Sequence, residues 1–168
     1  MSLVSNLVRT YRAPGTVIDG LDRQGLREPQ VLFFALLSCG LIFVAQWPGL
    51  SRAAALDPAV TLEQRMGGAL FGVMFMLPLL LYALAGLIQL VLRVAVAPIA
   101  GLRVRLALFW SLLSVTPLML LHGGLGGFLG AHPAVNLFGF VVAASFLYIL
   151  GAGLGTIVRR TRSEGSGQ

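Results

Sequence analysis

The chain has 168 residues, of which 57% are hydrophobic and only 11% are charged, and its mean hydropathy is +0.89. Soluble domains carry about 25% charged residues, so this chain cannot cover a water-facing surface and must expose much of itself to lipid. The net charge of +6 does not indicate a nucleic-acid-binding protein, because the arginines are spread over expected loops and termini rather than over a folded basic face.

Residues 1–30 form a polar to amphipathic segment that precedes the first long apolar stretch. Apolar side chains recur at helical spacing from Leu3 to Tyr11 and again from Val17 to Leu21, and Pro14 separates the two groups. We interpret the segment as cytoplasmic and its first helix, which carries Arg9, as lying on the bilayer surface. A tail that orders only by packing on the rest of the protein is the alternative.

The first membrane span is predicted over residues 31–47, which carry no charge. Trp47 is typical of a membrane interface, and Pro48 is predicted to end the helix. A cleaved signal peptide is the competing interpretation, because the alanines at 53–55 resemble a cleavage site, but a signal's apolar region is shorter. Cys39 lies inside this span and is expected to be an inert packing residue.

The second span is predicted over residues 67–92. Because about 20 helical residues cross a bilayer core, this longer segment should tilt or kink. Pro78 lies near its middle and is predicted to pack helices while loosening the span toward the carbonyl of Met74.

The third span is predicted over residues 106–121, after a basic loop that contains Arg93, Arg103 and Arg105. We expect these three arginines to contact lipid headgroups or a cytoplasmic protein. Trp110 is predicted to lie near the membrane interface. The run from His122 to Gly130 is predicted to be a glycine-rich loop on the opposite side.

A polar cluster within this third span precedes Pro117 and consists of Ser111, Ser114 and Thr116. We predict that these residues and Pro117 pack helices together, with the hydroxyls bonded to carbonyls freed near the kink or to the second span. A site for a small polar substrate is the alternative interpretation.

The fourth span is predicted over residues 134–158, and residues 159–168 are predicted to be a disordered tail. Ten of the twelve basic residues, all arginines, then lie on one side of the membrane. This bias predicts that both termini are cytoplasmic. The ten form what we call the arginine-rich end: Arg9, Arg12, Arg23, Arg27, Arg93, Arg103, Arg105, Arg159, Arg160 and Arg162.

Small residues four positions apart predict close helix packing, within one chain or between copies. The pairs are Gly68/Gly72, Ala107/Ser111, Gly123/Gly127, Gly126/Gly130 and Gly151/Gly155. No catalytic, cofactor or metal site is predicted. His122 and His132 lack an evident third ligand, so we interpret them as hydrogen-bonded groups, with haem or metal ligation as the alternative.

The chain resembles the bacterial branch of the Yip domain family, which are Rab/Ypt-interacting-protein-like membrane proteins. The resemblance rests on the segments 11–14, 41–52 and 105–123. It implies an integral membrane protein with a cytoplasmic N-terminus and a compact helix bundle. Members of the family often have five spans, which leaves open two short passes over residues 106–130.

The sequence therefore predicts an all-α polytopic membrane protein, a four-helix transmembrane bundle over residues 31–158. The use of arginine without lysine is typical of GC-rich genomes and favours a bacterial inner membrane. We expect a non-enzymatic protein that organises membrane or partner proteins. Its expected partners are lipids, further copies or other membrane proteins. The alternatives are a small transporter or channel with a polar site between the second and third spans, and an accessory subunit of a larger complex.

Overall fold

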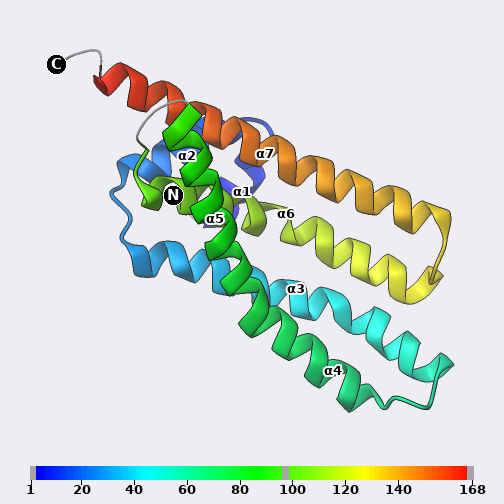
Figure 1. Cartoon of the computed structure of the whole chain (residues 1–168). Coiled ribbons are helices and arrows are strands. Elements are labelled where there is room, and N and C mark those ends of the chain that lie inside the picture. The colour runs from blue at the N-terminus through cyan, green and yellow to red at the C-terminus, as the bar shows by residue number, and fades with distance from the viewer. Residues whose placement is uncertain (1–2, 96–98, 166–168) are drawn as a thin grey trace.

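The computed structural model describes residues 3–95 and 99–165, and every regular element in these ranges is a helix (Figure 1). Four helical segments are long and apolar enough to cross a membrane: Glu28–Leu56, Leu62–Val94, Gly101–Leu129 and Pro133–Ser163. The prediction of an all-α polytopic bundle is therefore confirmed. The N-terminal helices and the last turns of α7 lie at one end of the bundle, and the α3–α4 and α6–α7 connections lie at the other (Figure 1).

Helices α1 (Leu3–Thr10) and α2 (Pro14–Arg23) form from the two predicted amphipathic groups. The apolar face of α2 is buried, including Val17, Ile18 and Leu21, and α2 packs along α7 and against α6. Helix α1 packs more lightly and leaves Val4 and Val8 exposed. Helix α2 is thus ordered by contact with the rest of the protein, and a position of α1 on the bilayer surface stays a prediction.

Helix α3 (Glu28–Leu56) continues through Pro48, where the sequence predicted a helix end. A proline in a span removes one backbone hydrogen bond, but an unwound segment in lipid would leave more groups unpaired, so the helix persists. The extension carries Arg52, which reaches the end of α6. The Nη1 atom of Arg52 donates to the carbonyls of Gly127 and Phe128, at 3.4 and 3.3 Å, near the end of α6.

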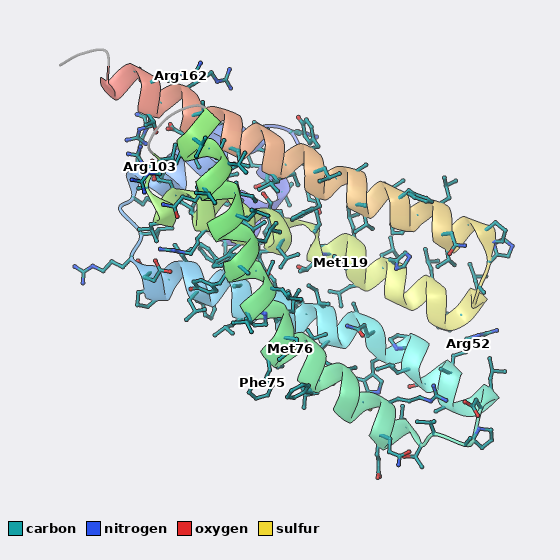
Figure 2. All side chains as sticks on the ribbon, in the orientation of Figure 1. Arg52, Phe75, Met76, Arg103, Met119 and Arg162 are labelled. Carbon is teal, nitrogen blue, oxygen red and sulfur yellow. The ribbon has the colours of Figure 1, made fainter. Side chains whose placement is uncertain are left out.

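The second span consists of α4 (Leu62–Phe71), a π-helical turn named η1 (Gly72–Met76) and α5 (Leu77–Ala95). Thr61 and Gln64 form a capping box that starts α4. The π-turn immediately precedes Pro78, and the amide of Leu77 donates to the carbonyl of Gly72, five residues back. The predicted loosening thus takes the form of a π-turn, from which Phe75 and Met76 project outward (Figure 2).

Helix α6 (Gly101–Leu129) is one continuous helix. Residues 106–130 therefore make one pass rather than two, and the predicted glycine-rich loop from His122 is wrong. The glycines of this run are helical because they allow close packing on a neighbour. The chain turns only at Gly130, whose φ of 66° suits glycine, and α7 (Pro133–Gly165) begins three residues later.

Two glycines of α6 lie directly on α3. A Cβ atom at Gly123 would overlap the carbonyl oxygen of Ala45, and one at Gly127 would overlap the ring of Pro48. The neighbouring Gly124 has open space around it, and so do the predicted packing pairs Gly68/Gly72 and Gly151/Gly155. Of the predicted glycine pairs, Gly123/Gly127 is thus the one in which both members meet the backbone of another helix.

The core is built around the first half of α6, which is covered by α3, α5, α7 and the two N-terminal helices. Residues 106–116 of this helix are all buried. Helix α7 continues to Gly165, so the tail predicted to be disordered from residue 159 is helical as far as the structure describes it. Residues 166–168, and Pro98 in the predicted basic loop, lie outside the described residues.

Candidate functional site

The arginine-rich end is assembled from five segments: α1–α2, the start of α3, the end of α5, the start of α6 and the end of α7. Figure 2 shows Arg103 and Arg162 at this end and Arg52 at the opposite end. The side chains divide into two groups. Three are partly buried and ion-paired, namely Arg103, Arg105 and Arg160, whereas Arg9, Arg12, Arg23, Arg27, Arg93, Arg159 and Arg162 are exposed.

The first ion-paired group joins α2 to α6 and α7. Asp22 of α2 accepts from Arg160 Nη1 at 2.8 Å and faces Arg103 Nε at 3.3 Å, while Asp19 faces Arg160 Nη1 at 3.3 Å. Arg103 also donates to the hydroxyl of Thr161 at 3.3 Å. Because the Asp22 side chain is only 12% exposed, little solvent screens these pairs.

The second group joins α3, α5 and α6. Arg105 Nη2 lies 2.8 Å from Glu28 Oε2, and the Tyr82 hydroxyl donates to Glu28 Oε1 at 3.2 Å. The guanidinium carbon of Arg105 also lies 5.8 Å from the centre of the Tyr82 ring. Of the three arginines predicted to contact lipid or a partner, two are therefore engaged within the protein. Arg93 is exposed on α5, and contact with lipid or a partner remains a prediction for all three.

The hydroxyl cluster of α6 bonds within its own helix. Ser111 donates to the Ala107 carbonyl at 2.6 Å, and Ser114 donates to the Trp110 carbonyl at 2.8 Å. Thr116 donates at 2.8 Å to the Leu113 carbonyl, which Pro117 leaves without its usual amide partner. The bond of Thr116 is thus of the kind expected for kink repair, whereas Ser111 and Ser114 bond to carbonyls that Pro117 does not free, and Pro117 itself is exposed.

Trp110 is buried against other helices rather than facing lipid or headgroups, and its position near the membrane interface stays a prediction. Its indole Nε1 donates to the Thr10 hydroxyl at 3.0 Å, and its ring meets Phe34 edge-on with centroids 5.1 Å apart. Tyr11 donates to the Ser114 carbonyl, beside the Pro117 kink. Burial raises the pKa of Tyr11 above its ordinary value, so its phenol stays protonated and remains a donor.

Sequence reasoning missed the roles of Thr10 and Tyr11, which attach α1 to the core. The available signal was Trp110 itself, because a buried indole N–H needs an acceptor. It did not identify that acceptor, which lies 100 residues away in the chain.

The two histidines make different contacts. His132 Nδ1 accepts from the Ala134 amide at 3.2 Å and so caps the start of α7. His122 stacks on Phe138, with centroids 6.2 Å apart, and lines cavities on both sides of α6, against α3 and against α7. Within residues 3–95 and 99–165, no three His, Cys, Asp or Glu residues group in a way that could hold a metal ion.

Comparison with known proteins gives no match, either to a family model, to a curated protein or to a solved structure. The Yip-like resemblance therefore remains a prediction from the sequence segments that carry it.

Proposed function

We propose that the chain is a non-enzymatic, Yip-like integral protein of a bacterial inner membrane, which organises membrane or partner proteins through its arginine-rich end. The observation that carries this proposal is the distribution of charge. The arginine-rich end has ten arginines and four acidic residues, whereas the opposite end has two of each, so the entire net charge of +6 belongs to one end. Such a bias orients that end, and with it both termini, toward the cytoplasm.

The geometry supports a role in binding rather than orientation alone. The three partly buried arginines hold α2, α3, α5, α6 and α7 together, while the seven exposed ones, of which Arg23 pairs with Asp19 of its own helix, remain on the surface. Basic residues near a membrane attract anionic lipid at about 1 kcal/mol each, and they equally attract an acidic protein surface.

Transport or channel activity is the weaker alternative. It requires a polar cavity between the second and third spans. The four cavities that we describe lie instead between α3 and α6, between α6 and α7 (two of them), and between α2 and α7. The hydroxyls of Ser111, Ser114 and Thr116 donate to carbonyls of their own helix and line none of these four.

The proposal is tested by orientation and partner capture in living bacteria. Reporter fusions to either terminus should give cytoplasmic fluorescence and no periplasmic phosphatase activity. A photo-crosslinking residue at position 27, at the arginine-rich end, should capture a defined protein that the same residue at position 59, at the opposite end, does not.

Two results would contradict it. Phosphatase activity from a C-terminal fusion would reverse the orientation. Protein adducts from both positions would favour the alternative of an accessory subunit enclosed in a larger complex, and no adduct from position 27 would overturn the organising role.

A further inference from the structure

A cavity of about 430 Å³ lies between the start of α2 and α7, at the arginine-rich end. Arg12, which precedes α2, and Arg159 of α7 both line the cavity. Tyr148, which lies nearer the start of α7, also lines it. All three side chains are exposed. The cavity therefore offers two guanidinium groups and a phenol to a ligand that arrives from outside the bundle.

The cavity extends well into the apolar part of the protein. Tyr148 precedes Arg159 by eleven residues in α7, a distance of about 16 Å along the helix axis. Arg12 follows Tyr11, which bonds to the Ser114 carbonyl near the middle of α6. An arginine at such a depth is costly in lipid unless it meets an anion or reaches the headgroup layer.

The charge of the cavity is positive. Its one acidic lining residue is Asp19, which is already paired with Arg23 at 2.8 Å and with Arg160 at 3.3 Å. The hydroxyls of Thr16 and Thr156 also line it, but they donate to the carbonyls of Ala13 and Ala152. The side-chain donors left for a ligand are therefore the guanidinium groups of the two arginines and the phenol of Tyr148.

Phosphate is the group that fits such a donor set, because guanidinium groups bind its oxygens through paired, charge-assisted hydrogen bonds. Arg159 uses its Nε atom on the Gly155 carbonyl at 3.2 Å, which leaves both terminal nitrogens for a ligand. The surface next to the cavity is apolar, since Leu147 is 65% and Tyr148 57% exposed on α7. A ligand that carries both a phosphate and a hydrocarbon chain matches both surfaces.

We propose that this cavity binds the headgroup of an anionic phospholipid, with its phosphate between Arg12 and Arg159 and its acyl chains along α7 beside Tyr148. The proposal deepens the proposed function by placing a lipid site at the arginine-rich end. It needs no protein partner, so failure to capture a protein from position 27 leaves it standing.

The test uses the full-length protein, purified in an uncharged detergent and stripped of lipid. Phosphatidylglycerol, phosphatidylcholine and inorganic phosphate are added separately, and binding is measured by native mass spectrometry and by the shift in melting temperature. We expect phosphatidylglycerol to bind and to raise the melting temperature, whereas the other two do neither.

Two double variants that each lose two positive charges distinguish binding in the cavity from general electrostatic attraction of anionic lipid to the arginine-rich end. Arg12→Gln with Arg159→Gln should weaken phosphatidylglycerol binding by at least about tenfold, since each lost charge-assisted contact is worth roughly that factor. Arg27→Gln with Arg162→Gln, at the same end but away from the cavity lining, should change it less than about twofold, because screened surface charges contribute little. The melting temperature of each variant without lipid checks that it folds.

Three outcomes would overturn the proposal: equal losses in the two double variants, equal binding of phosphatidylcholine, or stabilisation by inorganic phosphate as large as by lipid. The last would assign the cavity to a soluble phosphate. If the double variant does not fold, Arg12→Gln and Arg159→Gln are measured singly. The proposal is then overturned if both single variants bind lipid as tightly as the wild type.

Discussion

The buried indole of Trp110 shows how single polar atoms determine the position of the N-terminal helices. Tryptophan is common at membrane interfaces, and the sequence prediction followed that tendency. In the structure the ring is 1% exposed, with its N–H on Thr10 and its edge on Phe34. Periodicity within one segment identifies the buried face of a helix, but it does not identify a hydrogen-bond partner from a distant segment. For the hydroxyl cluster the sequence left two kinds of partner open, and the partners observed lie within the same helix.

Replacing Thr10 with valine tests this attachment. Thr10→Val preserves the shape of the side chain but leaves the buried Trp110 N–H without its acceptor, so the free energy of unfolding should fall by about 1–3 kcal/mol. Unfolding in mixed detergent micelles, followed by tryptophan fluorescence, measures the change. Ser145→Ala, which removes a hydroxyl bonded only to Val141 of the same helix, is the control and should change stability by less than about 0.5 kcal/mol. Equal effects in both variants would show that the Trp110 contact is not special.

At the scale of elements, the sequence predicted the four spans but ended the helices of the first and third too early. Proline and glycine often end helices in water, and they occur here at Pro48 and in the run from His122 to Gly130. In lipid the helix is the conformation that pairs all backbone groups, so both segments stay helical. The close contact of α3 and α6 provides the further reason, since Gly123 and Gly127 bring the two backbones together. That contact depends on the pairing of distant helices and was therefore not readable from local composition.

Adjacent glycines in α6 provide a matched test of this contact. Gly123→Ala adds a methyl group where the Ala45 carbonyl lies, so α3 and α6 must move apart and stability should fall by about 1–3 kcal/mol. Gly124→Ala adds the same group in open space and should be neutral or stabilising by up to about 1 kcal/mol, because alanine favours the helix. Detergent-induced unfolding followed by circular dichroism compares the two. A loss of stability in Gly124→Ala as large as in Gly123→Ala would contradict the observed packing.

For the whole molecule, counting arginines along the chain assigned ten of them to one side of the predicted membrane. Counting did not distinguish arginines that stay on the surface from those that join helices. Arg103 and Arg160 meet Asp22, and Arg105 meets Glu28, across chain separations that only the folded bundle defines. Part of the predicted contact site therefore joins helices within the protein, while the exposed arginines beside it, such as Arg12 and Arg159, belong to the same predicted basic end.

The Asp22 pairs predict how firmly α2 is held. Asp22→Asn removes the charge that faces Arg103 and Arg160 and should lower stability by about 1–3 kcal/mol, because hydrogen bonds to charged groups are worth roughly that much. Trypsin should then cut faster at Arg23 and Arg27, as measured by mass spectrometry of the fragments. Asp57→Asn disrupts the Arg65 pair at the opposite end, where Asp57 is 59% exposed, and should cost less than about 1 kcal/mol. Unchanged cleavage in Asp22→Asn would show that apolar packing alone holds α2.

The packing of α2 along α7 also sets an order of assembly. Ribosomes release the N-terminal helices first, yet most of their docking surface belongs to the last helix of the chain and to α6. Until α7 has entered the membrane, Ile18 cannot pack against Gly153, and Asp22 cannot pair with Arg160. The earliest segment to be made is therefore among the last to reach its place, and the completed bundle is closed by contact between the two ends of the same chain.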